Sequence, residues 1–212
     1  MINVVAIDGA AGSGKSTLAK ALAIELGLPY VNTGLMYRAV ARAALDAGLD
    51  LDDEEAVLTV IPGSRFRLAG EPGELEVEGY PLETLHSPEV DAAVSAVARH
   101  PKVRAIMRAE QRAIGSGRGA VMEGRDIGTV VFPDAALKIF LRADPKEREA
   151  RRAGERGAPD GEVASALRAR DLADSRVNPL EPASDAIVLD TTDANAEDTL
   201  RQALDLARER LA

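Results

Sequence analysis

The sequence predicts an α/β fold, a three-layer sandwich around a five-stranded parallel sheet. Two observations support this class. Short apolar runs alternate with stretches of helical spacing at both ends of the 212-residue chain, as in proteins whose parallel strands are joined by crossover helices. A glycine-rich string also follows the first apolar run directly and opens the first helix, an arrangement typical of phosphate-binding loops.

The first part of the chain supplies two strands and two helices. Residues 3–8 read Asn-Val-Val-Ala-Ile-Asp, a β-branched apolar run that predicts a buried strand. Leucines at helical spacing predict a helix over residues 15–26, and Gly27 is a suitable stop residue. A second strand is predicted at residues 29–31 and a second helix at residues 34–47.

Residues 62–85 have a different composition, because glycine and proline recur between short alternating pieces. These pieces, at residues 65–69 and 74–78, predict a small β insertion with a turn at Glu71-Pro72-Gly73. Helices are then predicted at residues 88–99 and 102–114, separated by a proline.

The second half of the chain supplies three more strands, predicted at residues 120–123, 136–141 and 186–189. The last two strands are separated by a polar, arginine-rich stretch, residues 145–173, that glycines interrupt. A final amphipathic helix is predicted over residues 194–211, with Asp193 as its N-cap.

The composition excludes several classes of protein. Cysteine is absent, which excludes disulfides, thiol catalysis and cysteine-ligated zinc. The formal net charge of −9 argues against binding to nucleic acid through its phosphates. No apolar run reaches the length of about 18 residues that a membrane span requires, and the amino terminus lacks a basic signal-peptide start. We therefore expect a cytoplasmic monomer that acts on small molecules, without nucleic-acid or membrane partners.

Residues 9–16 form a phosphate loop, because Gly-Ala-Ala-Gly-Ser-Gly-Lys-Ser matches the pattern GxxxxGK[ST]. Since the string joins a strand to a helix, its backbone amides and the helix N-terminus can point at phosphate oxygens. Lys15 is suited to bridge the β- and γ-phosphates, and the Ser16 hydroxyl is suited to coordinate Mg²⁺. The predicted nucleotide-binding residues are Gly9, Ala10, Ala11, Gly12, Ser13, Gly14, Lys15, Ser16 and Thr17.

A nucleotide site alone leaves the function open. The Asn-Lys-x-Asp string with which signalling GTPases read guanine is absent. The apolar strand at residues 120–123 ends in Glu123-Gly124-Arg125-Asp126, where transport and motor ATPases usually place an aspartate. An arginine beside a carboxylate suits binding of a second phosphorylated molecule better than positioning of a hydrolytic water.

Three further strings carry a resemblance. Residues 33–38 read Thr-Gly-Leu-Met-Tyr-Arg, residues 123–135 read Glu-Gly-Arg-Asp-Ile-Gly-Thr-Val-Val-Phe-Pro-Asp-Ala, and residues 170–180 read Arg-Asp-Leu-Ala-Asp-Ser-Arg-Val-Asn-Pro-Leu. Together with the phosphate loop, they resemble the bacterial cytidylate kinases, which are nucleoside monophosphate kinases. The resemblance extends from residue 3 to about residue 190.

This resemblance implies a P-loop NTPase fold that transfers the γ-phosphoryl group of ATP to CMP or dCMP, giving ADP and CDP or dCDP, with Mg²⁺ bound beside the nucleotide. Residues 1–212 would form a single kinase domain. Its parts would be a core at 1–60, 115–144 and 180–212, a β-containing monophosphate-binding insertion at about 61–114, and a helical lid at about 145–179.

The resemblance also implies roles for individual residues. Ser95, Arg104 and Asp126 match positions that read cytosine. Thr33, Arg38, Arg125 and Arg176 match positions near the monophosphate, with Tyr37 in the same pocket, and Arg170 and Asp174 match a lid motif that reaches ribose and phosphates. The predicted catalytic residues are Lys15, Arg125, Asp126 and Arg152. Two departures from the family pattern are Asn32, where aspartate is common, and a segment after Asp174 that is about two residues shorter.

Alternatives remain open at this point. Arg148, Arg151, Arg152 and Arg156 are consistent either with a solvated helix face paired to nearby glutamates or with a mobile lid that contacts ATP. His86 and His100 are expected at the surface or in turns. The acceptor could be UMP or another small compound, and a nucleotide-dependent switch without phosphoryl transfer is the alternative from another class.

Overall fold

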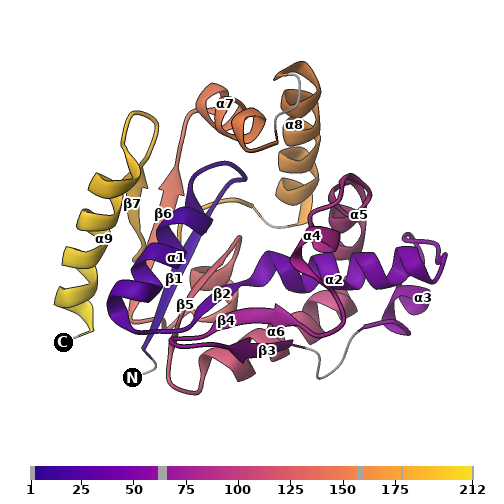
Figure 1. The fold of residues 1–212 in the computed structure, drawn as a ribbon, viewed down its shortest axis with the longest axis horizontal. Helices are drawn as coiled ribbons and strands as arrows, with labels where there is room; N and C mark the ends of the chain where they lie inside the picture. Colours follow the sequence, from indigo (N-terminus) through magenta and orange to yellow (C-terminus); the bar gives the residue numbers. More distant parts are fainter. Residues whose placement is uncertain (1–2, 62–65, 157–159, 178, 212) are drawn as a thin grey trace.

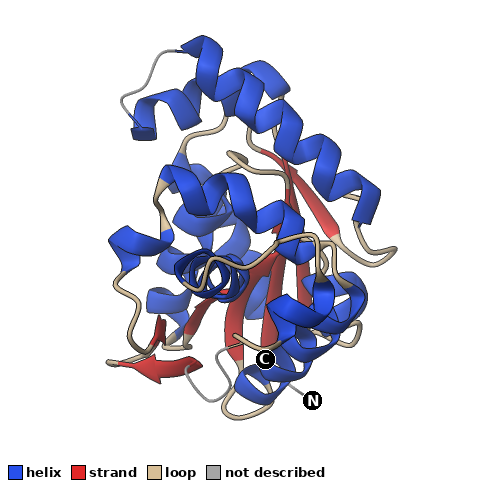
Figure 2. Ribbon diagram, turned by 90° about the vertical axis from the view of Figure 1, so that its right-hand side faces the viewer, coloured by secondary structure: helices blue, strands red, loops and turns tan. Residues whose placement is uncertain are grey.

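The structure, a computed structural model, describes residues 3–61, 66–156, 160–177 and 179–211. It confirms the α/β fold, with helices on both faces of one mostly parallel sheet (Figures 1 and 2). The strands are β1 (Val4–Gly9), β2 (Tyr30–Asn32), β3 (Phe66–Ala69), β4 (Glu74–Val77), β5 (Ala120–Gly124), β6 (Leu137–Arg142) and β7 (Ile187–Asp190).

Within the described residues the sheet has seven strands in the order β3-β4-β2-β5-β1-β6-β7, so the prediction of five was wrong. The predicted β insertion is the hairpin β3–β4, which joins the same sheet because the edge of β2 offers unpaired backbone groups. The Tyr30 amide donates to the Gly73 carbonyl at 2.8 Å, and Lys20 of the neighbouring helix pairs with Glu74 at 3.0 Å. Among the described strands, only β3 runs antiparallel to its neighbour.

The helices follow the predicted order. They are α1 (Lys15–Leu26), α2 (Thr33–Asp46), α3 (Glu54–Leu58), α4 (Leu82–Leu85), α5 (Pro88–Ala98), α6 (Pro101–Gly115), the π-helix η1 (Ile127–Val131), α7 (Pro145–Arg156), α8 (Asp160–Val177) and α9 (Ala196–Arg210). The short helices α3, α4 and η1 were not predicted. Asn195 caps α9 by accepting from the Asp198 amide, so the prediction of Asp193 was wrong. None of the described helices is both long and apolar enough to cross a membrane.

Two hydrophobic cores form because strand side chains alternate between the faces of the sheet. Val5 and Ile7 of β1 point toward α1 and α9 and pack with Leu22. Val4 and Ala6 point to the other face, where α2, α5 and α6 cover them. The central strands are therefore buried on both faces, as is usual for parallel sheets.

The register of three central strands brings their carboxyl ends together. Asn32 of β2 lies beside Glu123 of β5, and Gly124 lies beside Asp8 of β1. The chain leaves these strands as the start of α2, the segment 125–126 and the phosphate loop. In open α/β sheets this edge is where ligands bind.

The buried carboxylate of Asp8 fixes the segment that follows β5. Asp8 accepts hydrogen bonds from the Ile127 amide at 2.8 Å and the Gly128 amide at 2.7 Å, which tie η1 to the end of β1. Burial raises the pKa of Asp8 from its ordinary value of 3.8 to about 6, against the lowering effect of those two amide bonds. Since Arg125 and Asp126 immediately precede η1, Asp8 helps to set their position.

We expect the buried side chains of α1 to contribute far more to the free energy of unfolding than its exposed side chains. Leu22 is fully buried, so Leu22→Ala should lower the free energy of unfolding by about 2–5 kcal/mol. Ile24, on the same helix, has 62% of its surface exposed, and Ile24→Ala should change the free energy by less than about 0.5 kcal/mol. Urea unfolding of both variants measures the difference, and equal losses would contradict the assigned packing.

The raised pKa of Asp8 predicts a pH dependence of stability. Between pH 3.8 and about 6 the folded protein binds more protons at Asp8 than the unfolded chain, so this contribution is complete below pH 3.8 and is lost as the pH rises through 6. Asp8→Asn removes this titration. From pH 3.8 to above pH 6, the free energy of unfolding of the wild type should therefore fall by up to about 3 kcal/mol more than that of Asp8→Asn. Urea unfolding at pH 4, 5, 6 and 7 measures both proteins, and parallel curves would contradict the prediction.

Candidate active site

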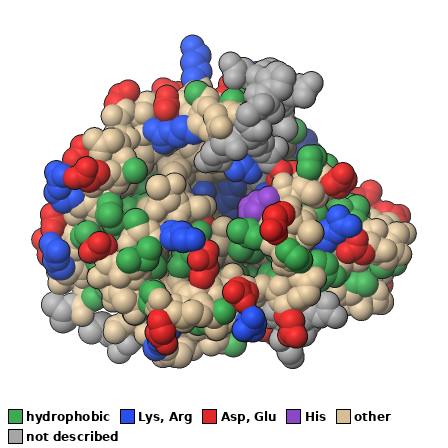
Figure 3. Space-filling model, in the orientation of Figure 1, with side chains coloured by type: hydrophobic (Ala, Val, Ile, Leu, Met, Phe, Trp, Pro, Cys, Tyr) green, Lys and Arg blue, Asp and Glu red, His purple; other side chains and the backbone are tan. Residues whose placement is uncertain are grey.

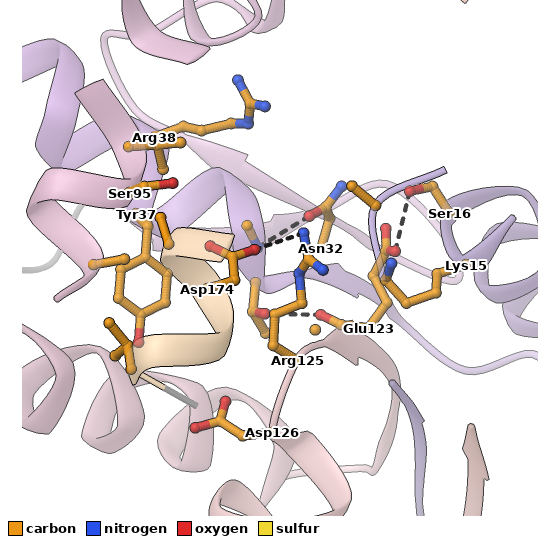
Figure 4. Close-up of a pocket in the computed structure, with 18 of the residues that line it drawn as sticks. Lys15, Ser16, Asn32, Tyr37, Arg38, Ser95, Glu123, Arg125, Asp126 and Asp174 are labelled. Carbon is orange, nitrogen blue, oxygen red and sulfur yellow. Dashed lines mark hydrogen bonds and ion pairs between the residues drawn. The ribbon is translucent and has the colours of Figure 1, made fainter. Parts of the chain in front are cut away.

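An open cleft lies over the carboxyl ends of β2, β5 and β1. Figure 3 shows the hollow, in which Lys and Arg side chains gather, although the whole chain is acidic. The structure brings most of the predicted site residues to the walls of the cleft. They are Ala11, Gly12, Lys15, Ser16, Thr33, Tyr37, Arg38, Ser95, Arg104, Arg125, Asp126, Arg152 and Asp174. Figure 4 shows Lys15 and Ser16 at one side of the cleft, with Tyr37 and Asp126 at the other.

The phosphate loop needs its glycines for different reasons. A side chain at Gly12 would meet the Arg148 carbonyl at 2.8 Å, so the backbone of α7 can approach the loop only because this residue is glycine. Gly14 is the N-cap of α1 at a φ of 89° and provides no side-chain cap, which leaves the first amides of α1 available to an anion. Lys15 Nζ donates to the Ala10 carbonyl at 2.7 Å, across the loop.

A second cavity adjoins the phosphate loop. It is lined by Ser13, Gly14, Thr17, Leu18, Leu141, Arg151, Thr191, Ala194, Ala196 and Thr199. The Ser13 hydroxyl is buried and has no hydrogen-bond partner within the described part of the chain. The phosphate loop and the start of α1 thus separate two cavities, with Lys15 and Ser16 on the wall of the first, open cleft.

Glu123, at the end of β5, is a site residue that the sequence reasoning did not select. Its carboxylate accepts from the Ser16 hydroxyl at 3.0 Å and from the Tyr30 hydroxyl at 2.5 Å, and only 3% of the residue is exposed. Burial, followed by the charge of Glu123, raises the pKa of Tyr30 well above its usual range, so the phenol remains a donor. The signal was present in the sequence, as an acidic residue that ends an apolar strand after a phosphate loop.

Asp126 is held by two arginines on the floor of the cleft. Arg104 Nη2 and Arg108 Nη2 both donate to Asp126 Oδ2, at 2.8 and 2.9 Å. Tyr37 stands nearby, and burial raises its pKa to about 12. Ser95 of α5 lines the same cleft. Arg108 was not among the predicted site residues.

The side chains expected near a monophosphate already contact protein groups. Arg38 is buried and donates to the Leu85 carbonyl at 2.8 Å and to Asp91 at 2.5 Å. Thr33 donates to the Glu123 carbonyl at 2.8 Å. These contacts fix both side chains in the wall of the cleft.

The helix α8 reaches the cleft with one face. Ala173, Asp174 and Val177 line the cleft, and Asp174 pairs with Arg125 at 2.9 Å. Arg176 lies off this face and is exposed, so the structure does not bring it to the cleft. The side chain of the predicted Arg170 lies outside the described part of the structure.

The arginines of α7 were expected either on a solvated helix face paired to glutamates or in a lid that contacts ATP, and the structure shows features of both. Arg151 makes an i,i+4 pair with Glu147 at 3.1 Å, as expected for a solvated face, but it also reaches the Thr191 carbonyl. Arg148 is buried, and it donates to the Ala11 carbonyl at 3.0 Å and pairs with Asp171 of α8 at 2.7 Å. Arg152 lines the cleft. The Arg156 side chain lies outside the described residues.

The two histidines differ in their surroundings. His86 is exposed and lines the cleft. His100 is buried, with Nε2 lying 2.8 Å from the Leu51 carbonyl, and it caps the start of α6 in the turn after α5, so of its two expected places it has the turn and not the surface. The described part of the chain holds no group of three or more His, Asp or Glu side chains arranged to bind a metal ion.

Comparison with known proteins agrees with this geometry. The sequence profile of the family described as Cytidylate kinase matches residues 5–209. A cytidylate kinase from Geobacillus sp. (strain WCH70) is 42% identical over 217 residues, covering 98% of this chain and 97% of the relative. A cytidylate kinase from Pelotomaculum thermopropionicum is 44% identical, covering 93% of this chain and 92% of the relative.

Solved structures resemble the fold at low sequence identity. The structure of TT1252 from Thermus thermophilus is similar with a TM-score of 0.50 and 22% identity, covering 99% of this chain and 97% of that one. An uncharacterized protein from Eubacterium ventriosum is similar with a TM-score of 0.53 and 13% identity, covering 98% and 99%. These two likenesses concern the fold, whereas the profile and the close relatives show that this chain belongs to the cytidylate kinase family of nucleoside monophosphate kinases.

Proposed function

We propose that this protein transfers the γ-phosphoryl group of ATP to CMP or dCMP, giving ADP and CDP or dCDP. Family membership supports this activity, and the observation that carries it is the pair of cavities beside one phosphate loop. A transferase for two nucleotides needs one site for each, joined where the phosphates meet. A switch that binds a single nucleotide needs only one.

The second cavity, beside Ser13 and Arg151, is suited to the nucleoside of ATP. It opens beside Gly14, where the first amides of α1 would bind phosphate oxygens. Arg151 borders the cavity, and its planar guanidinium is suited to stack on a base. The Ser13 hydroxyl, which lacks a partner within the described residues, is available there as a donor or acceptor.

The residues beside Lys15 fit a magnesium ion that is bound with the nucleotide. Ser16 and Glu123 present oxygen ligands 3.0 Å apart, and oxygen is the ligand that Mg²⁺ prefers. Nucleotide phosphates and water would supply the remaining ligands, as is usual for Mg²⁺ in such sites. When bound, the ion would neutralise charge on the phosphates. The Tyr30 hydroxyl donates to Glu123 Oε1, the carboxylate oxygen that Ser16 does not contact, and so orients the Glu123 carboxylate.

Cations around the cleft would stabilise the transferring phosphoryl group. Lys15, Arg125 and Arg152 all line the cleft near the phosphate loop. Such a reaction depends mainly on positioning and on preorganised charge, with little covalent chemistry for the protein to perform. We assign Arg125 to the acceptor phosphate, because it lies between the loop carbonyl of Gly9 and Asp174.

The helices α7 and α8 act as a lid in this proposal. They contact each other, and α8 also contacts α5 on the acceptor side of the cleft (Figure 1). A lid that closes over both nucleotides excludes water, which would otherwise accept the phosphoryl group. The contacts of Arg148 with Ala11 and Asp171 link the lid to the phosphate loop.

A coupled assay tests the proposed function against its alternatives. ADP formation is measured with CMP, dCMP, UMP, AMP or GMP and without an acceptor. We expect ADP production that depends on CMP or dCMP and is much slower with UMP. Hydrolysis that needs no monophosphate would favour a switch, and equal use of UMP would favour a different acceptor.

The arginines on Asp126 predict how base choice can be changed. Because Oδ2 accepts from Arg104 and Arg108, Oδ1 would accept from the amino group of cytosine. In Asp126→Asn the amide oxygen should face the arginines, which leaves the amide NH₂ toward the base. That donor disfavours cytosine and suits the carbonyl of uracil.

We expect the ratio of kcat/KM for CMP to that for UMP to fall about 10-fold or more in Asp126→Asn, from loss of a charge-assisted bond worth about 1.5–3 kcal/mol. The control Arg125→Ala should lower both values nearly equally, because both acceptors carry the phosphate. A parallel fall for both acceptors in Asp126→Asn would show that Asp126 does not read the base.

A further inference from the structure

Arg108 makes a contact that the proposed reaction leaves unexplained. Its Nη2 lies 2.9 Å from Asp126 Oδ2, the oxygen that also accepts from Arg104 at 2.8 Å. Arg104 and Asp126 line the cleft, whereas Arg108 is absent from the described lining. Its hydrogen-bonded route to the cleft is through Asp126, and its charge also acts on Tyr37 of the cleft wall.

The helix α6 explains how both arginines reach one carboxylate. Arg104 and Arg108 are four residues apart and so lie on the same helix face. Like charges at this spacing repel each other, and the shared carboxylate between them offsets the repulsion. Arg112, one turn further on, donates to the Val130 and Val131 carbonyls of η1 at 2.8 and 2.9 Å.

The carboxylate is almost enclosed, which makes its orientation important. The Asp126 side chain is 11% exposed and the Arg104 side chain 13%. Oδ2 is occupied by two donors, and Oδ1 makes no hydrogen bond to the described part of the chain. A single donor on Oδ2 would leave the carboxylate able to turn about its Cβ–Cγ bond, whereas two donors from different positions on α6 restrict that rotation.

We propose that Arg108 is a positioning residue that determines base specificity, and this inference rests on the proposed function. Arg108 holds Asp126 Oδ2 while Arg104 turns its donors to the ring nitrogen or carbonyl of the bound base. Asp126 then keeps Oδ1 directed at an exocyclic amino group. The same arrangement disfavours a base that presents a carbonyl there, because two acceptors would face each other.

The buried Nε of Arg108 supports this assignment. It has no hydrogen-bond partner within the described residues, so the guanidinium gives up one possible bond to reach Asp126 through Nη2. Arg112, on the same helix face, instead uses both Nε and Nη2 on backbone carbonyls, so the two arginines bind different kinds of group.

Steady-state kinetics with CMP and UMP tests the inference in the full-length protein. Arg108→Gln removes the positive charge and the contact, Arg108→Lys keeps the charge, and Arg112→Gln is the matched control on the same helix face. In Arg108→Gln we expect KM for CMP to rise about 5- to 10-fold, as for loss of one hydrogen bond of typical strength, with kcat within about 2-fold of wild type and KM for UMP nearly unchanged. Arg108→Lys should recover most of the CMP-to-UMP ratio, and Arg112→Gln should keep the wild-type ratio even if its melting temperature falls.

The outcomes separate this inference from the proposed function. If the wild type prefers CMP and Arg108→Gln keeps that preference, the role of Arg108 is wrong and the proposed function stands. If kcat and both KM values change in parallel in Arg108→Gln, Arg108 has only a structural role, which also overturns the inference. A wild type that uses CMP and UMP equally overturns both. Should Arg108→Gln fail to fold, Arg108→Met takes its place, because methionine keeps much of the side-chain length and provides no donor for Asp126. A folded Arg108→Met with the wild-type CMP-to-UMP ratio overturns the inference, and a lowered ratio that Arg108→Lys largely restores supports it.

Discussion

The active site depends on one constraint, the parallel register of β2, β5 and β1. This register aligns Asn32, Glu123 and Asp8 at one edge of the sheet, although the three residues are far apart in the chain. Each strand then delivers a different component. The phosphate loop follows β1, Thr33 begins α2 after β2, and Arg125 and Asp126 follow β5. A shift of one residue in any pair would turn inward-facing side chains to the opposite face of the sheet.

Three buried carboxylates hold the groups of the cationic cleft in place through hydrogen bonds and ion pairs. Asp8 binds the amides of η1, Glu123 accepts from Ser16 and Tyr30, and Asp126 accepts from Arg104 and Arg108. Burying a charge is costly unless it is paired or hydrogen-bonded, and each of these groups meets that condition. The acidic side chains thus orient the donors and cations, and a chain of net charge −9 presents a positively charged site to phosphates.

The helices α7 and α8, which form the lid in the proposed reaction, are joined to the phosphate loop through the backbone as well as through side chains. Gly12 allows the Arg148 carbonyl to approach the loop, and the Arg148 guanidinium returns to the Ala11 carbonyl. On the other side of the cleft, Arg125 joins the strand end to Asp174 of α8. In the proposed reaction a phosphate would compete with Asp174 for Arg125, so acceptor binding and lid position would be linked.

The sequence by itself determined the features that depend on neighbouring residues. The five adjacent parallel strands from β2 to β7, the long helices and the phosphate loop follow from local apolar spacing and from glycines, and the site strings at 33–38 and 123–126 were recognisable as written. Only the tertiary structure decided that the β3–β4 hairpin extends the main sheet, because edge pairing depends on which strand is left uncovered. It also decided that Glu123 meets Ser16, that Arg108 shares Asp126 with Arg104, and that Arg176 is exposed outside the described lining of the cleft. The physical reason is that these contacts depend on the register of strands and the rotation of helices, which local spacing does not specify.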